Sequence, residues 1–485
     1  MKRTNSKKHL LIVLFLILSL VFTACSSAKN DAATTDKATT EAGSTGDSKV
    51  STILPATSSS VKDGGGSEVT AKTDVPVTTS SPESPKEAPE AYDYRDGDVL
   101  IESSFAMKDA GTMDMIAGAE MPVSEKYEGD DVIVTDPTSR PQVKAGILTA
   151  GEWNDNQNFD FIKNLLNDGQ SYDYKDFFTK WDIAPFNRLA IKVTGSDENF
   201  VQGANVTVYD GNGTSVWKGV TDYEGMLYAY YSLLDSSVMP AKVTAEYNGV
   251  SVDYDVVSDD LKDSSVISLT LDAEPKMKTL DLMFTVDTTG SMGDEIFYLQ
   301  EELQDVIKRV QNDTANIPVR LSVNFYRDLG DEYVVRPYEF STNINEQLAY
   351  LNKEYATGGG DFEEAVEQAL ANCVNEHSWN ADSIKILFLV LDAPPHNTLE
   401  IRQSLIDTLS KASEMGIRII PVASSGIDKD TEFLLRAFAM TTGGTYTFLT
   451  DDSGVGESHL EPTVGQYEVE QLNDLLVRLI EKYIG

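Results

Sequence analysis

Oxygen-bearing side chains are concentrated in three short segments of the C-terminal half of the chain. The first is VDTTGSMGDE, where Asp287, Thr289 and Ser291 occupy alternate positions directly after the apolar run LDLMF. Alternate spacing lets one loop present a carboxylate and two hydroxyls from the same side. The glycines in this segment relax the backbone for the tight turn that such a loop requires.

The other two segments carry similar groups. Thr357 and Asp361 lie in the glycine-rich stretch YATGGGDFEE, and Asp392 ends the apolar run SIKILFLVLD. Carboxylate and hydroxyl oxygens are the ligands that hard cations such as Mg²⁺ and Ca²⁺ prefer. The sequence therefore predicts a divalent-cation site, provided that the fold brings the three segments together.

From residue 280 onward, apolar runs alternate with amphipathic helical patterns. LDLMFTV, VRLSVNFY, SIKILFLVLD and IRIIPVA have the continuous hydrophobicity of buried strands, and GDEIFYLQEELQDVIKRVQND and LEIRQSLIDTLSKASEMG have helical periodicity. This alternation predicts an α/β fold with a doubly wound parallel sheet covered on both faces. Sites in such sheets form at the carboxyl ends of the strands, where Asp287 and Asp392 are expected.

Residues 278–485 resemble the von Willebrand factor type A (vWA) domain, a Rossmann-like fold with a metal-ion-dependent adhesion site. The first motif of that site, Asp-x-Ser/Thr-x-Ser, is matched by Asp287, Thr289 and Ser291, and its late aspartate is matched by Asp392. The resemblance implies a Mg²⁺ or Ca²⁺ ion. It also implies a protein ligand, or a neighbouring subunit, bound through that ion in adhesion or envelope assembly.

The middle ligand of the family is usually a threonine in a glycine-rich loop. Here Asp361 takes that position, and Thr357 is a rival for the role. Three carboxylates, with Asp361 added to Asp287 and Asp392, would offset the whole charge of a divalent ion. Such an ion would attract an external carboxylate less strongly, so a structural or vacant metal site is the alternative.

A serine hydrolase is a further alternative, because Ser291, Asp392 and His396 follow the chain order of a hydrolase triad. The nucleophile-elbow pattern G-x-S-x-G is absent around Ser291, and His396 lies only four residues after Asp392. The sequence therefore favours a binding module over an enzyme.

The N-terminus predicts export and membrane anchoring. Residues 1–25 carry a basic start, an apolar core too short to span a bilayer, and the sequence FTAC, which resembles the lipobox of bacterial lipoproteins. That resemblance implies a lipid anchor at Cys25 and a protein that faces outside the cytoplasm. The other cysteine, Cys373, then has no partner within the chain, and its helical context predicts a small core residue.

Composition separates the remaining regions. The formal net charge is −39 over 485 residues, which argues against nucleic acid as a partner. Residues 26–91 are rich in Ser, Thr and Pro and predict a disordered tether. Residues 92–187 are acidic and contain too many aromatic residues for a linker, so they are expected to pack against a neighbouring domain. Residues 188–273 alternate in short β-rich runs, which predicts an all-β sandwich that resembles carboxypeptidase-regulatory-like spacers.

Overall fold

The computed structural model describes residues 143–167, 174–183, 185, 187–233, 235–276, 278–313 and 317–485. The signal-like segment 1–25 with Cys25, the tether 26–91 and the first part of the region 92–187 lie outside the described residues. Within the described ranges, no helix combines the length and the apolar character that crossing a membrane requires.

A mixed eight-stranded sheet forms the centre of the C-terminal domain, in the order β11-β10-β9-β12-β13-β14-β1-β15. The five strands from β10 to β14 in this order run parallel, and the other three pair antiparallel with their neighbours. The strand bounds are β1 (Thr149–Trp153), β9 (Leu280–Asp287), β10 (Val319–Tyr326), β11 (Val335–Arg336), β12 (Ile384–Leu391), β13 (Ile417–Ala423), β14 (Tyr446–Leu449) and β15 (Glu470–Gln471).

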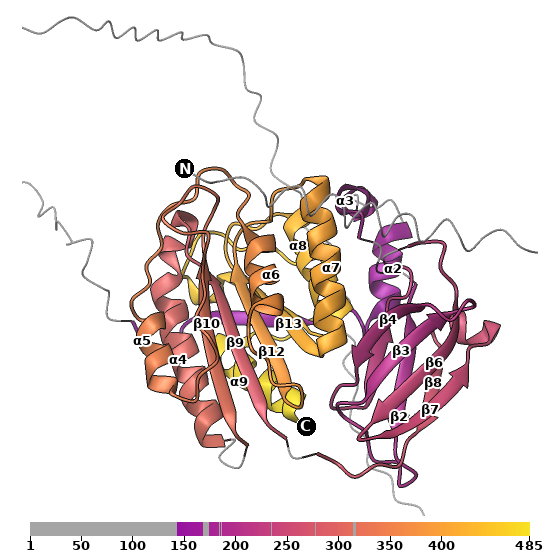
Figure 1. Ribbon diagram of the computed structural model, residues 1–485. Helices are drawn as coiled ribbons and strands as arrows, with labels where there is room; N and C mark the ends of the chain where they lie inside the picture. The colour runs from indigo at the N-terminus through magenta and orange to yellow at the C-terminus, as the bar shows by residue number, and fades with distance from the viewer. Residues whose placement is uncertain are drawn as a thin grey trace, which may run out of the picture. The chain divides into compact units, whose positions relative to one another are not determined.

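Helices cover both faces of this sheet, as the α/β pattern predicts (Figure 1). Alternate residues of β9 show the division, because Leu282 and Phe284 pack into one core while Met283 packs into the other. The first core includes α4 (Ile296–Asp313), α5 (Ile344–Leu351) and α9 (Leu472–Ile484). The second includes α6 (Val366–Asn375), α7 (Leu399–Met415) and α8 (Lys429–Thr442). Cys373 of α6 is fully buried in the second core, as its helical context predicts, and it is a free thiol among the described residues.

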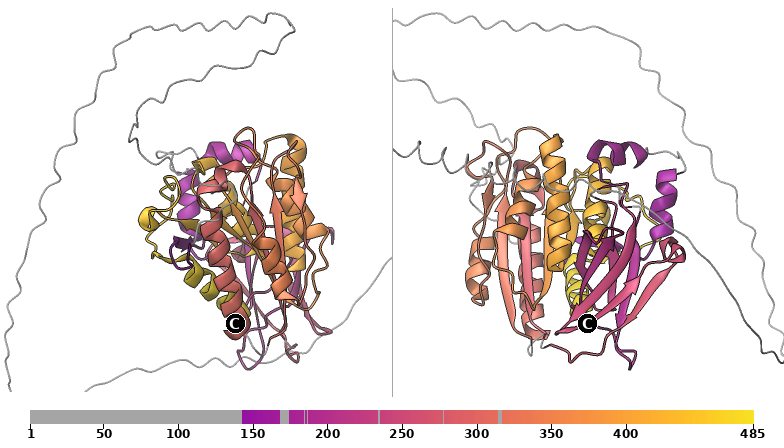
Figure 2. Two further views of the ribbon diagram at one scale, coloured as in Figure 1. Left: turned by 90° about the vertical axis from the view of Figure 1, so that its left-hand side faces the viewer. Right: turned by 45° about the vertical axis from the view of Figure 1, so that its right-hand side comes forward.

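A segment that precedes the expected 278–485 range contributes to the same sheet. Strand β1 pairs antiparallel with β14, and α2 (Phe159–Asn167) and α3 (Tyr174–Trp181) follow it. Helix α3 lies beside α8 (Figure 2), and the Trp181 indole donates a hydrogen bond of 2.7 Å to Asp430 of α8. The aromatic residues in this region therefore pack onto the helical layer.

A buried ion pair joins this segment to α8. Arg436 donates from Nε and Nη2 to the two carboxylate oxygens of Asp155, at 2.8 and 2.6 Å, and both side chains are almost fully buried. Trp153 donates to the same carboxylate at 2.9 Å, and Arg436 also donates to the Tyr174 hydroxyl at 3.2 Å. The guanidinium and the carboxylate are thus well supplied with partners, which such a buried pair needs to offset desolvation.

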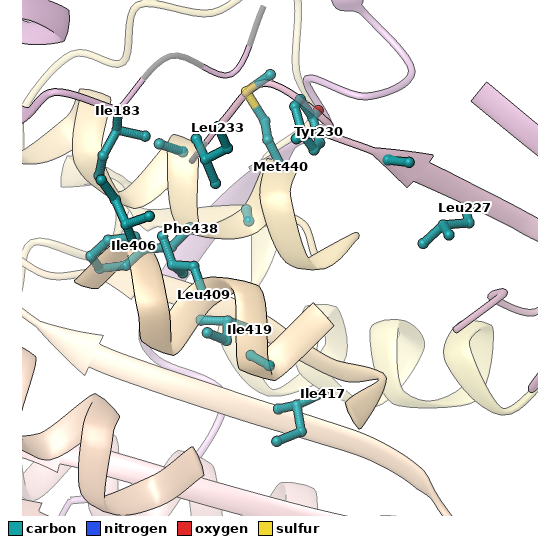
Figure 3. Close-up of a cluster of buried hydrophobic side chains, with 14 of the residues drawn as sticks. Ile183, Leu227, Tyr230, Leu233, Ile406, Leu409, Ile417, Ile419, Phe438 and Met440 are labelled. Atoms are coloured by element: carbon teal, nitrogen blue, oxygen red, sulfur yellow. The ribbon is translucent and has the colours of Figure 1, made fainter. Parts of the chain in front are cut away.

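Residues 188–271 form two smaller sheets, ordered β5-β2-β8 and β4-β3-β6-β7. Their buried side chains belong to the same hydrophobic cluster as α7 and α8, and Figure 3 shows Leu227, Tyr230 and Leu233 of this part together with Leu409 and Met440. The bounds are β2 (Leu189–Thr194), β3 (Asn205–Asp210), β4 (Ser215–Val220), β5 (Met226–Ala229), β6 (Pro240–Tyr247), β7 (Val250–Asp255) and β8 (Val266–Thr270). The described residues also contain the 3₁₀ turns η1 (Ser258–Leu261), η2 (Gly290–Asp294) and η3 (Asp451–Ser453).

The substitution Asp155→Asn should lower the free energy of unfolding by about 3 kcal/mol, because it removes the carboxylate that binds the buried Arg436 through two hydrogen bonds and leaves only Glu432, at 3.8 Å, as a buried counter-charge. Glu414→Gln is the matched control, since the Lys218–Glu414 pair is 48% and 37% exposed and should contribute at most about 1 kcal/mol. Chemical denaturation followed by tryptophan fluorescence measures both changes. Equal effects of the two substitutions would contradict a stabilising role for the buried pair.

Candidate metal centre at the carboxyl edge of the sheet

Three adjacent parallel strands end in acidic residues. Asp287 is the last residue of β9, Asp392 directly follows β12, and Asp328 comes two residues after β10. Strand β9 lies between β10 and β12, and its register pairs Tyr326 with Asp287, so the three ends lie at one edge. The chain leaves β9 toward β10 on one side and returns to β12 on the other, which makes this edge a topological switch point.

The first motif turns directly from β9 into η2. The backbone N–H and the hydroxyl of Thr289 donate to Asp287 Oδ1 at 2.9 and 2.7 Å, and the Thr289 hydroxyl lies 3.3 Å from that of Ser291. Asp287 is fully buried, and its second oxygen, Oδ2, has no hydrogen-bond partner among the described residues. Thr289 therefore holds Asp287 Oδ1 in place, while Oδ2 is available to bind a ligand.

Glu364 is a buried carboxylate that the sequence analysis did not single out. Its backbone N–H donates to Pro394 O at 2.9 Å, which ties the end of the glycine-rich loop to the segment after β12. Glu364 and Asp392 are 2% and 3% exposed, and within the described residues one oxygen of each, Glu364 Oε2 and Asp392 Oδ1, has no hydrogen-bond donor.

Burial, together with the neighbouring carboxylates, raises the pKa values of these acids. Burial raises the pKa of Asp392 to about 8, and the neighbouring Asp287 carboxylate adds to the rise. Burial raises the pKa of Glu364 to about 9, with Asp287, Asp328 and Asp392 contributing. The pKa of Asp287 rises to about 6 because burial outweighs the hydrogen bonds from Thr289. Without a cation, these carboxyl groups repel one another once they are deprotonated, so they keep their protons to a higher pH than exposed acids do.

The glycine-rich loop lies against the first motif through backbone contacts. The Thr357 N–H donates to Thr288 O at 3.0 Å, and the Gly290 N–H donates to Gly358 O at 3.1 Å. Gly359 has φ +75°, and a Cβ there would approach Glu364 Oε1 to 2.8 Å. Only glycine suits this position, because a side chain would be both strained and in contact with the buried carboxylate.

The two rival middle ligands both lie at the surface. The Asp361 side chain is 63% exposed, and its Oδ2 lies 3.8 Å from Nε2 of His396. Thr357 is also exposed. The acid of this loop that is buried with Asp287 and Asp392 is Glu364, three residues after Asp361. Glu364 lies directly before the apolar pattern of α6, and this position in the sequence could have indicated that Glu364 is buried.

His396 lies beside acids of the edge. Its Nδ1 is 3.9 Å from Asp328 Oδ1, and no hydrogen bond joins it to Ser291 among the described residues. The structure therefore gives the triad order of Ser291, Asp392 and His396 no geometric support.

The donor set fits a divalent cation. Among the described residues, Asp287 Oδ2, Asp392 Oδ1 and Glu364 Oε2 are buried oxygens without a hydrogen-bond donor, whereas buried polar atoms in proteins nearly always have a partner. All three are carboxylate oxygens, the ligand type of Mg²⁺ and Ca²⁺. Asp287, Ser291 and Asp392 are the residues that would hold such an ion, and Glu364 lies beside them.

The cation-free protein should lose stability as the pH rises from 5 to 8. Folding raises the pKa of Asp287, Glu364 and Asp392, so the folded state binds protons more tightly than the unfolded chain. Proton binding therefore stabilises the folded state at low pH, and this stabilisation is lost as the pH rises through the raised pKa values. Urea unfolding in chelator measures the effect. In Asp392→Asn the loss of stability between these pH values should be smaller by on the order of 2 kcal/mol. Parallel pH profiles for the two proteins would contradict the carboxylate clustering.

Comparisons with known proteins agree with the fold. The family model of the von Willebrand factor A domain matches residues 281–454. The chain is 30% identical over 125 residues to the putative ariadne-like RING finger protein R811 of Acanthamoeba polyphaga mimivirus, a match that covers 26% of this chain and 12% of that protein. It is 23% identical over 228 residues to the alpha-protein kinase vwkA of Dictyostelium discoideum, which covers 46% of this chain and 36% of the kinase. The chain thus spans well under half the length of either relative. It contains a von Willebrand factor A domain.

Proposed function

We propose that this vWA domain binds a protein ligand, or a neighbouring subunit, through a Mg²⁺ or Ca²⁺ ion at the carboxyl edge of the sheet. Asp287, Ser291 and Asp392 hold the ion, Glu364 lies beside them, and Thr289 orients Asp287. The observation that carries the proposal is the group of buried carboxylate oxygens that have no hydrogen-bond donor within the described part of the chain. The chain acts as a binding module in adhesion or envelope assembly rather than as an enzyme.

The loops around the centre support a protein as the partner. Leu329, Tyr355 and Phe362 are exposed large apolar side chains, and each lies within two residues of Asp328, Thr357 or Asp361 in the sequence. Exposed apolar groups next to a polar centre are typical of protein interaction surfaces. Domains of the vWA family commonly take part in protein interactions, which agrees with this surface.

The remaining regions are proposed to place the domain at a distance from a membrane. Residues 1–25 direct export, Cys25 carries the lipid, and residues 26–91 form the tether. The two smaller sheets act as a β-sandwich spacer. This spacer is joined firmly to the vWA domain, because Arg418 donates to Val220 O at 2.5 Å and Ser413 donates to Lys218 O at 3.0 Å.

Partner capture from envelope extract tests the proposed function. Wild-type bait should retain a specific protein in Mg²⁺ or Ca²⁺ and release it in chelator, and Asp287→Asn bait should retain none. Asp253→Asn is the matched control, because it makes the same change at an exposed position on β7.

A rim variant separates the interaction surface from the ion. Phe362→Ser should weaken capture while the stabilisation of the bait by added cation is unchanged, because this side chain is exposed. Capture that is equal in chelator and in cation, or equal for wild type and Asp287→Asn, would contradict the cation-dependent proposal.

The lipid anchor is tested by Cys25→Ser. Cells that make the native chain should hold it in the membrane fraction, whereas the variant should be released or left unprocessed. Fractionation followed by immunoblotting measures the distribution. Equal membrane retention of the two proteins would argue against an anchor at Cys25.

A further inference from the structure

A second group of potential ligands lies beside the first centre. Asp328, Asp361 and His396 each offer one atom, and these three atoms all lie within 4.8 Å of one another. The residues come from three segments, namely the loop after β10, the glycine-rich loop and the loop after β12. The fold, not local sequence, brings them together.

Two of these atoms are buried and unpartnered within the described part of the chain. Asp328 is only 7% exposed, and its Oδ1 has no hydrogen-bond partner. Nδ1 of His396 also has no hydrogen-bond partner and lies 3.9 Å from that oxygen, although the His396 side chain as a whole is 27% exposed. This distance is too long for a hydrogen bond. Buried polar atoms nearly always have a partner, so we expect a bound ion or water between these two atoms.

The spacing suits a metal ion. Bonds of about 2.0–2.2 Å in tetrahedral geometry hold ligand atoms about 3.3–3.6 Å apart. His396 Nδ1 lies 3.9 Å from Asp328 Oδ1, only slightly farther than this, and His396 Nε2 lies 3.8 Å from Asp361 Oδ2. One imidazole gives a single nitrogen to an ion, so all three residues would share one ion within the 4.8 Å that their ligand atoms span. Small movements of the three side chains would complete the coordination, and the exposed Asp361 is free to make the largest.

The other histidines in the described residues differ from His396. Both ring nitrogens of His377 lie within hydrogen-bond distance of Asn372 O and Asn324 Oδ1, at 3.2 and 3.1 Å. Both nitrogens of His459 lie within such distance of Asp451 and Glu295, at 2.9 and 3.0 Å. Those two rings are held by protein partners, whereas His396 has none at hydrogen-bond distance in these ranges.

Glu367 provides a further carboxylate near this group. It is buried on α6, and its Oε2 has no hydrogen-bond partner among the described residues. Burial raises its pKa, and the charges of His396 and Asp328 also act on it. A buried acid next to a metal-bound imidazole serves as an additional ligand or orients the ring.

We propose that Asp328, Asp361 and His396 form a second metal site, which takes a transition-metal ion such as Zn²⁺. An imidazole with carboxylates selects Zn²⁺ and similar ions, whereas the oxygen-only centre at Asp287 and Asp392 selects Mg²⁺ or Ca²⁺. Asp361, which the sequence assigns to the first centre, belongs to the second. The domain then carries two neighbouring ions of different chemical class.

Calorimetric titration of the full-length chain with Zn²⁺, in saturating Mg²⁺, tests this site. Wild type should bind one Zn²⁺ that Mg²⁺ does not displace. His396→Gln and Asp361→Asn should each raise the Kd at least about tenfold, because even residues that only orient a metal ligand contribute 10–100-fold. Asp361 is exposed, so its substitution leaves folding intact. His459→Gln is the control and should leave this Kd unchanged, whereas Asp287→Asn, which changes the first centre, should still bind one Zn²⁺.

Co²⁺ in place of Zn²⁺ gives a second measurement. Its visible absorption should change in His396→Gln, because the imidazole is lost from the ion, and should be unchanged in His459→Gln. Equal Zn²⁺ affinity in wild type, His396→Gln and Asp361→Asn would overturn the proposal. His396 would then only lie beside Asp328 and Asp361 without binding a metal ion. Loss of the Zn²⁺ site in Asp287→Asn would also overturn it, because both ions would then share one centre.

Discussion

The repulsion among buried carboxylates at the ends of β9 and β12 is the constraint around which this edge of the domain is organised. Asp287, Glu364 and Asp392 are each at least 97% buried, and each has an oxygen without a donor among the described residues. Placing such charges together is costly unless an opposite charge compensates them. In the proposed function, a divalent cation supplies that charge, and the grouped carboxylates are its ligands.

The scaffold tolerates this cost because the rest of the domain is well packed. The central strands are buried on both faces, and two hydrophobic cores lie on either side of them. Strand β1 and the Asp155–Arg436 pair extend this support to a segment far away in the sequence. Backbone hydrogen bonds hold the glycine-rich loop against the first motif. The side chains of the loop are therefore not needed to position it and can contribute to the site. Stability and ligand geometry therefore come from different parts of the molecule.

The sequence predicted those parts of the site that depend on local pattern. An apolar run followed by Asp-x-Thr-x-Ser placed Asp287 correctly at a strand end, and a second run did the same for Asp392. Glu364 and Asp328 were missed because their burial results from the packing of loops that are distant in the chain. Strand β1 was missed for a similar reason, since its pairing with β14 spans about 300 residues and leaves no periodic signal nearby.

The location of bound Mn²⁺ in a crystal of the protein, found from its anomalous scattering, tests the central claim most directly. Mn²⁺ takes the same oxygen ligands as Mg²⁺ and can be distinguished from water. The account predicts an ion bound by Asp287, Ser291 and Asp392 with Glu364 beside it. A crystal saturated with Mn²⁺ that shows no ion at Asp287 and Asp392 would contradict the account.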